Sequence, residues 1–192
     1  MANKIIVIFV EGQSEEKFYS KLCKQIQQNE GTSNKILIRN LKGIGNYENK
    51  AHSKLKHEII PKYKDSSILV FLCYDTDVFD IPFQQKPPVN WKNVEKKIMR
   101  LGLTNIFHIK AKKSIEDWFL KDFDSLTKFL KLKKTIKTKG NCGYQKISWL
   151  FKQGNKVYQK GYNVNNFVET LNYVHLADVL KDELSDLISK MK

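Results

Sequence analysis

Three carboxylates follow apolar segments, where acidic side chains are unusual. Glu11 comes directly after the apolar run 5–10, and Asp75 and Asp77 end the segment SSILVFLCYDTD. In an extended chain, residues two apart point to the same side, so both aspartates can bind one cation. Mg²⁺ prefers oxygen ligands, usually one or two carboxylates with water and substrate phosphate completing its shell. The three acids therefore predict a site for a hard divalent cation.

The elements that position these acids alternate between strand and helix over the first 110 residues. Strands are predicted at 4–10, 35–41, 66–75 and 105–110. Helices are predicted from three sets of apolar positions: Phe18, Leu22 and Ile26, with Ser14 as N-cap; Leu55, Ile59 and Tyr63, shortened or bent by Pro61; and Val94, Ile98 and Leu101. A loop containing Pro82, Pro87 and Pro88 is expected before the third helix.

This alternation predicts an α/β fold, with a mostly parallel central sheet and helices on both faces. In such folds, ligands bind outside the carboxyl ends of the strands. Glu11 follows the first predicted strand, and Asp75 and Asp77 follow the third. The acids thus fall where this architecture places chemistry.

A third acidic group, KSIEDWFL at 113–120, follows the fourth predicted strand. Ser114 followed by Asp117 is typical of a capping box, which gives the segment a purely structural interpretation. The functional alternative is that Glu116 or Asp117 completes the metal site. Lys113 and Ser114 would then contact phosphate. Among Lys110, Lys112 and Lys113, one could stabilise negative charge developing on an attacked phosphate; the alternative is that all three are solvated.

Residues 121–192 are predicted to form a basic helical extension packed on a domain of residues 1–120. The stretch 129–140 is rich in lysine and has no clear amphipathic face. Helices are expected around 144–152, around 163–171 and from His175 to the end. Lysines and aromatic residues interleave at 144–162, which fits either base stacking or the core side of helices.

The charge balance favours a polyanionic partner. The chain has 34 Lys and Arg against 20 Asp and Glu, a net charge of +14. Nucleic acid is the first candidate and an anionic membrane surface the second. The alternative is a cationic protein from a lysine-rich genome. The lysines expected to bind nucleic acid are Lys110, Lys112, Lys131, Lys133, Lys134, Lys137 and Lys139.

The three cysteines, Cys23, Cys73 and Cys142, are widely spaced and form no CxxC motif. They predict neither a disulfide framework nor a zinc site, and they favour a reducing compartment. The apolar run 5–10 is too short for a signal sequence or a membrane span. We therefore expect a cytoplasmic protein with no membrane partner.

Three motifs resemble those of Toprim domains and occur in the same order. They are VEGQSEEKF at 10–18, the GIG turn at 43–45 and YDTD at 74–77. KSIEDWFL looks like the following segment of small Toprim-like nucleases of the overcoming-lysogenization-defect (OLD) kind. The resemblance covers residues 4–120. It implies a Rossmann-like Toprim fold and phosphoryl transfer that depends on Mg²⁺ or Mn²⁺.

The resemblance also implies roles for individual residues and partners. Glu11 would be a metal ligand or general base, and Asp75 and Asp77 would be metal ligands. Nucleases of the OLD kind also carry an ATPase, and this sequence has no GxxxxGK[ST] motif, so an ATPase would be a separate partner. Phage defence, repair and RNA processing are the processes that a Toprim protein of this size would serve.

The expected activity is metal-dependent hydrolysis of phosphodiester bonds in DNA or RNA. Two metal ions about 3.5–4 Å apart can stabilise both the attacking and the leaving oxygen. Three alternatives stay open: a nucleic-acid-binding or regulatory module without catalysis, a phosphatase that uses the DxD motif, and a receiver-like phosphoacceptor domain. The phosphatase motif normally has Thr or Val where this chain has Phe79.

Overall fold

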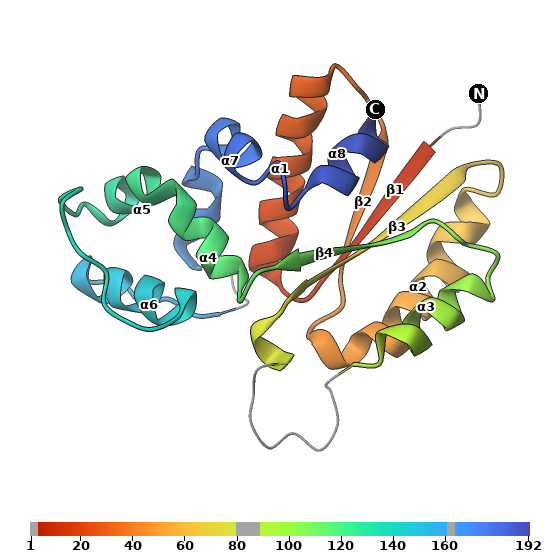
Figure 1. Cartoon of the computed structure of the whole chain (residues 1–192), viewed down its shortest axis with the longest axis horizontal. Coiled ribbons are helices and arrows are strands. Elements are labelled where there is room, and N and C mark those ends of the chain that lie inside the picture. Colours follow the sequence, from red (N-terminus) through yellow and green to blue (C-terminus); the bar gives the residue numbers. More distant parts are fainter. Residues whose placement is uncertain (1–3, 80–88, 161–163) are drawn as a thin grey trace.

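A four-stranded, all-parallel sheet forms the centre of the molecule (Figure 1). The computed structural model describes residues 4–79, 89–160 and 164–192, so the predicted loop with Pro82, Pro87 and Pro88 lies outside the described residues. The strands are β1 (Lys4–Val10), β2 (Lys35–Asn40), β3 (Ser67–Asp75) and β4 (Ile106–Ala111), in the order β2-β1-β3-β4. All four predicted strands are confirmed, with ends that shift by one residue.

Alternate residues of β1 and β3 face opposite sides of the sheet, and both sides are buried. Ile6, Ile8 and Val10 pack on one side, whereas Ile5 and Phe9 pack on the other. Strands covered on both faces need continuous apolar runs rather than alternation. This is why the two central strands are the most apolar segments of the sequence.

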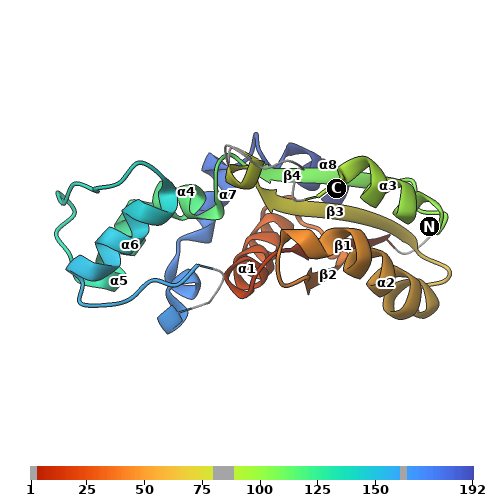
Figure 2. The ribbon, with the colours of Figure 1, turned by 90° about the horizontal axis from the view of Figure 1, so that it is seen from below.

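Helices cover both faces of this sheet, as predicted (Figures 1 and 2). One face packs in a single apolar cluster with α1 (Gln13–Glu30), α4 (Ile115–Phe119), α5 (Phe123–Leu130), α6 (Gly143–Gln153), α7 (Tyr173–Val179) and α8 (Ser185–Met191). The other face packs against a helical stretch at 44–62, which contains α2 (His52–Lys54), and against α3 (Trp91–Met99). The fold is α/β and consistent with a Rossmann-like arrangement.

The first helix begins earlier than predicted. Gly12 rather than Ser14 is the N-cap of α1, and Ser14 is buried inside the first turn. The backbone N–H of Gly12 donates to the side chain of Glu15, the third residue of the helix. This bond satisfies the backbone N–H of the N-cap residue, while Gly12, which has no side chain, returns no bond to the first turn. The cap therefore ties Glu15 to the end of β1.

The second helical stretch starts inside the GIG turn, at Ile44, eleven residues before Leu55, the first apolar position that predicted the helix. It contains wide, π-type turns at Tyr47–Ala51 and Leu55–Ile59, and it ends at Lys62, just after Pro61. Tyr47 is buried, and its hydroxyl donates to the carbonyl oxygens of Phe9 and Cys73. The stretch is thereby fastened to the two central strands.

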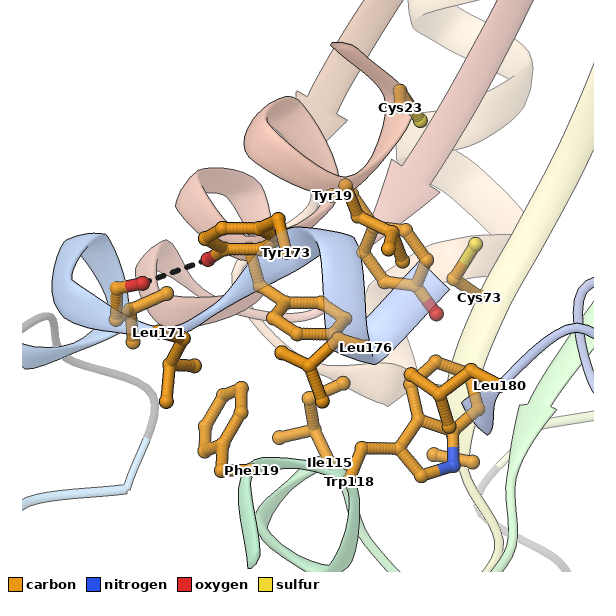
Figure 3. Close-up of a cluster of buried hydrophobic side chains, with 14 of the residues drawn as sticks. Tyr19, Cys23, Cys73, Ile115, Trp118, Phe119, Leu171, Tyr173, Leu176 and Leu180 are labelled. Atoms are coloured by element: carbon orange, nitrogen blue, oxygen red, sulfur yellow. Dashed lines mark hydrogen bonds between the residues drawn. The ribbon is translucent and has the colours of Figure 1, made fainter. Parts of the chain in front are cut away.

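The C-terminal part returns to the sheet. The helix expected at 163–171 is a run of tight 3₁₀ turns at Val164–Thr170, and the helix expected from His175 is the two helices α7 and α8. Figure 3 shows Tyr173, Leu176 and Leu180 packed between Tyr19 and the residues of α4. Among the described residues, no helix has the length and apolar character needed to cross a membrane.

Two of the four described aromatic residues at 144–160 are core residues, and Tyr162 lies outside the described residues. Phe151 and Tyr158 are buried and belong to the main apolar cluster, whereas Tyr144 is exposed. Trp149 is half-buried beneath the ammonium group of Lys139, 6.0 Å from the ring centre. The core interpretation of this segment is therefore confirmed for Phe151 and Tyr158.

Helix α6 is held against α4 by a close approach at Gly143. A Cβ atom at this position would lie 2.7 Å from the backbone nitrogen and carboxylate of Asp117. We expect Gly143→Ala to lower the free energy of unfolding by about 1–3 kcal/mol, the usual cost of overpacking. Helix propensity alone would instead raise the free energy of unfolding of the alanine variant by about 1 kcal/mol. The sign of the change in unfolding free energy therefore distinguishes the two effects. Urea denaturation provides the measurement.

Gly45→Ala is the matched control for this prediction. Gly45 has no positive φ, and a Cβ there would meet no heavy atom within 4 Å. The free energy of unfolding of Gly45→Ala should stay within about 0.5 kcal/mol of the wild-type value or rise slightly. If Gly143→Ala and Gly45→Ala were equally stable, the contact between α4 and α6 would accommodate the added methyl group without loss of unfolding free energy.

Candidate functional site

The site lies where the order of the strands reverses. From β1 the chain crosses to β2 on one side, and afterwards β3 and β4 are added on the other side. The gap between β1 and β3 is therefore the switch point of the sheet, the place where open α/β sheets bind ligands. Glu11 follows β1 and Asp75 ends β3, so two of the three predicted acids lie at this point.

Backbone N–H groups hold Asp75 and Glu11 together. The Oδ1 atom of Asp75 accepts the N–H of Ile115 at 2.8 Å, at the start of α4. The N–H of Asp75 in turn donates to Oε1 of Glu11 at 3.1 Å. Asp75 is only 3% exposed. These bonds fix the side chain of Glu11 to β3 and that of Asp75 to the loop after β4.

Asp77 lies beyond the end of β3, in a short 3₁₀ turn. The loop after β3 is joined to the end of β4 and the loop that follows by four hydrogen bonds: Thr76 N–H and Thr76 Oγ1–H to Ala111 O, Asp77 N–H to Lys113 O, and Lys113 N–H to Thr76 Oγ1. Lys113 adopts the left-handed conformation, with φ 69°, which is uncommon for a residue with a side chain. It is the backbone of Lys113 that braces the position of Asp77.

The carboxylates of Asp75 and Asp77 converge on Lys160. The Nζ atom of Lys160 lies 3.1 Å from Oδ2 of Asp75 and 3.3 Å from Oδ2 of Asp77. The extended geometry that made us expect convergence ends at Asp75, yet the two carboxylates still share one cation. Sequence reasoning missed Lys160 because it lies in an irregular segment 83 residues after Asp77.

Glu116 is the most deeply buried acid of the site. It has no exposed surface, and its Oε1 accepts the hydroxyl hydrogen of Tyr158 at 2.7 Å. Its Oε2 atom has no hydrogen-bond partner among the described residues. Tyr158 and Lys160, two residues apart, therefore both reach the acids from the C-terminal part of the chain.

Glu15 is a further site residue, which the sequence analysis did not select. It is 6% exposed and lies beside the Gly12 N–H. A pocket of about 180 Å³ opens beside it, lined by Glu11, Gly12, Ser14, Glu15, Gly43, Asp75, Ile115 and Lys160. The sequence signal for Glu15 was its place in the VEGQSEEKF motif, four residues after Glu11.

Burial dominates the electrostatics of this site. It raises the pKa of Asp75 to about 8, an effect that Lys160 opposes and that Glu116 and Glu11 reinforce. Burial also raises the pKa of Glu11, and it raises that of Glu15 further. Burial alone would lower the pKa of Lys160, but Asp75, Glu116 and Asp77 raise it above its usual value. Lys160 is thus a permanent cation amid acids that resist ionisation.

The remaining predicted site residues lie outside the pocket. Asp117 accepts the hydroxyl hydrogen of Ser114 at 3.1 Å and lies against Gly143, so its carboxylate has a structural role in the α4–α6 contact. The side chains of Lys110, Lys112 and Lys113 are exposed, as are those of the predicted nucleic-acid-binding lysines Lys131, Lys133, Lys134, Lys137 and Lys139. Lys134 pairs with Asp124 at 2.6 Å.

The acidic side chains that line the pocket, those of Glu11, Glu15 and Asp75, offer the oxygen ligands that a hard divalent cation prefers. The buried, partnerless Oε2 of Glu116 is a further acceptor that a cation or water would satisfy. Within the described residues, no three Asp, Glu, His or Cys side chains form a ready-made metal site. The position between Asp75 and Asp77 is taken by the ammonium of Lys160.

Comparison of the chain with protein-family models, with curated proteins and with solved structures found no match. The function must therefore be argued from the geometry and chemistry of this site.

The raised pKa of Asp75 predicts how stability depends on pH. In the folded state the pKa of Asp75 is about 8, whereas its ordinary value is 3.8. The free energy of folding gained from the protonated carboxyl group is therefore complete below pH 3.8. It is lost as the pH rises through about 8. Glu11, Glu15 and Glu116 face Asp75 with the same charge, and Lys160 with the opposite one. We expect the free energy of unfolding in EDTA to fall over this range.

Asp75→Asn isolates this effect, because the amide does not titrate and still offers Ile115 an acceptor. Its unfolding free energy, measured by urea denaturation in EDTA, should fall less steeply between about pH 5 and 8 than that of wild type. Part of the slope remains, since Glu11 and Glu15 have pKa values shifted in the same direction. Identical slopes for the two proteins would refute a buried, protonated Asp75.

Proposed function

We propose that this protein is a metal-dependent phosphodiesterase that hydrolyses DNA or RNA at the carboxyl ends of β1 and β3. The observation that carries the proposal is that Glu11 and Asp75 lie together at the switch point of the sheet, with Asp77 joined to Asp75 through Lys160. Their order along the chain, which resembles that of Toprim domains, supports the same activity. So does the net charge of +14, which favours a polyanionic substrate.

Bound Mg²⁺ or Mn²⁺ would supply a Lewis acid that stabilises negative charge on the attacked phosphate. Glu11, Glu15 and Asp75 line the pocket and would hold the cation. Lys160 lines the same pocket and carries a positive charge that can face a phosphate oxygen. Burial raises the pKa of Glu11, which makes this carboxylate a stronger base than one exposed to water and suits it to accept a proton.

The geometry favours a ligand role for Asp75 over a nucleophilic one. A phosphatase of the DxD type needs a free aspartate oxygen facing the substrate. In this protein Oδ1 of Asp75 accepts the N–H of Ile115, and Oδ2 pairs with Lys160. A non-catalytic binding module remains the second candidate, because Lys160 neutralises the aspartates without any metal. Metal-independent binding with no cleavage would establish it.

The partners proposed from the sequence are nucleic acid and, by resemblance to the OLD kind, an ATPase on a separate chain. The phosphate backbone would lie along exposed lysines, because most of the affinity of such complexes comes from contacts to phosphate. Lys131 and Lys133 follow the end of α5, and Lys131 ends that helix with a left-handed φ of 55°. The exposed run 131–139 is the proposed backbone-binding segment.

Glu11→Gln is expected to slow nucleic acid cleavage at least about 10²-fold, the lower end for losing a general base. The amide keeps an acceptor for the N–H of Asp75, so folding is preserved. In EDTA the melting temperature should stay level or rise, since one of several crowded acids is removed. The measurements are cleavage of labelled single- and double-stranded DNA and RNA in Mn²⁺, and thermal unfolding in EDTA.

Glu16→Gln is the matched control, because Glu16 is the neighbouring residue in α1 and does not line the acidic pocket. It should cleave at the wild-type rate. If Glu11→Gln cleaves at the wild-type rate, Glu11 is not part of the catalytic machinery. If the wild-type protein cleaves none of the substrates with any of the metals, the proposed function is overturned.

Replacing Lys131, Lys133, Lys134 and Lys137 together with Ala should weaken binding to a generic duplex and flatten its salt dependence. Every phosphate that the variant no longer neutralises should reduce the slope of log K against log salt by about 0.9. Fluorescence anisotropy in EDTA separates binding from cleavage. Lys21, Lys24, Lys62 and Lys64, changed together to Ala, provide a control with equal loss of charge. Equal slopes for both quadruple variants would mean that the 131–139 segment does not bind the backbone.

A further inference from the structure

A second cavity lies in the C-terminal part of the chain, and none of its lining residues lines the acidic pocket. Its volume is about 430 Å³, within the range of cavities that hold small molecules. Figures 1 and 2 show α4, α5 and α6, which border it, at the end of the molecule away from α2 and α3. This C-terminal cavity is lined by Leu120, Phe123, Ile136, Lys137, Thr138 and Lys146.

The C-terminal cavity has apolar walls and two basic side chains. Leu120, Phe123 and Ile136 are half-buried and pack against the main apolar cluster, and the part of them that stays uncovered lines the cavity. Lys137 is exposed and Lys146 is half-buried. Neither lysine forms a salt bridge within the part of the chain that the structure describes. Both are therefore left for an anion from outside.

The charges around this cavity are of one sign. Residues 125–168 contain lysines throughout but no Asp or Glu. Two acids lie on the segments that line the cavity, and both are engaged: Asp124 pairs with Lys134 at 2.6 Å, and buried Asp122 accepts two backbone N–H groups. A ligand that complements the cavity therefore combines an apolar part with negative charge.

We propose that the C-terminal cavity binds an unpaired nucleotide of DNA or RNA, with the base against Phe123 and Ile136 and the phosphate at Lys137 and Lys146. Nucleic acid as the polyanion follows from the proposed function, on which the inference rests, and the substrate is narrowed to strands with unpaired bases. Single strands are bound by aromatic side chains that stack on bases, beside cations that follow the backbone. A base in a duplex is stacked and paired, so it enters a cavity only after extrusion.

The lysines beside the cavity favour nucleic acid over an acidic peptide. The exposed lysines of the run 131–139 lie before and after Ile136 along the chain. Lys139 also lies over the ring of Trp149, 6.0 Å from its centre, on the helix that carries Lys146. A row of cations matches the regular charges of a phosphate backbone, whereas a peptide with an apolar anchor needs only the few cations next to that anchor.

The cavity is close enough to the acids for one strand to reach both. Helix α4 joins them, because Ile115 at its start lines the acidic pocket and Leu120, directly after its end, lines the C-terminal cavity. Five residues of helix advance roughly 7.5 Å. A strand whose base is held at Phe123 is therefore long enough to present a phosphate a few nucleotides away to the acidic pocket.

Binding in EDTA tests this assignment without cleavage. In fluorescence anisotropy, labelled oligothymidylate and oligouridylate are each compared with an abasic strand of the same sugar and length, which keeps the phosphates and lacks the bases. Wild type should bind the base-bearing strand more tightly in the DNA pair, the RNA pair or both. Phe123→Leu keeps an apolar side chain and removes the ring. It should weaken binding of the base-bearing strand at least about 5-fold, the lower end for losing an aromatic contact to a base, and leave the abasic strand unchanged.

Tyr63→Leu is the matched control, because Tyr63 is a half-buried ring with the ammonium groups of Lys35 and Lys62 near it and does not line the cavity. It should bind every strand as wild type does. Thr138→Leu, a change in an irregular segment that narrows the cavity, decides the matter if Phe123→Leu does not fold, as judged by circular dichroism. It too should weaken binding of the base-bearing strand alone.

Equal affinity of wild type for base-bearing and abasic strands, or unchanged affinity of the folded variant, would overturn the inference, and cleavage in Mn²⁺ would still leave the proposed function standing. Base-dependent binding without any cleavage would support the cavity's role and overturn the proposed function. A labelled peptide of aspartates ending in phenylalanine is the third probe. If it binds wild type more tightly than Phe123→Leu while the strands bind alike, the cavity takes a protein partner and the inference is wrong.

Discussion

The structure depends on keeping several carboxylates buried at one edge of a sheet with little positive charge nearby. Transferring a charged group out of water is costly unless a hydrogen bond or an opposite charge compensates. Each buried acid here has such a partner: Ile115 N–H for Asp75, Gly12 N–H for Glu15 and the Tyr158 hydroxyl for Glu116. Lys160 adds the one ammonium group that bridges Asp75 and Asp77.

These partners come from three separate parts of the chain, and this explains how the elements are arranged. Helix α1 starts at Gly12, immediately after β1, so its first turn brings Glu15 back over the strand end. Helix α4 starts two residues after Lys113, so that the N–H of Ile115 points at Asp75. The C-terminal part packs on the same sheet face as α1, in one continuous apolar cluster. From there it sends Tyr158 and Lys160 to the acids.

A surplus of buried acids is a weak way to stabilise a fold and a good way to bind a cation. Burial raises the pKa of Asp75 to about 8, so that without a bound cation this carboxyl group favours its protonated form at neutral pH. A divalent ion would reverse this preference by stabilising the charged forms. The energetic cost of crowding acids thus makes sense if the site is completed by a cation and a phosphate, and this is why we favour catalysis over binding alone.

The sequence by itself determined the sheet and the edge where the site lies. The apolar runs at 4–10 and 66–75 are too long and too continuous for strands exposed on one face, so a parallel sheet covered on both sides followed. The carboxyl ends of parallel strands meet at one edge, and this places Glu11 beside Asp75 without knowledge of any side-chain contact. Local periodicity sufficed for these conclusions because strand and helix patterns extend over few residues.

Only the tertiary structure decided which side chains complete the site. Lys160 and Tyr158 lie in an irregular segment with no periodic signal, and they reach the acids because the C-terminal part packs back on α1. The same packing turns Asp117 toward Ser114 and Gly143, away from the pocket, while its neighbour Glu116 points inward. Adjacent helical residues face different directions, and only the position of α6 beside α4 determines which of the two carboxylates is left to the site.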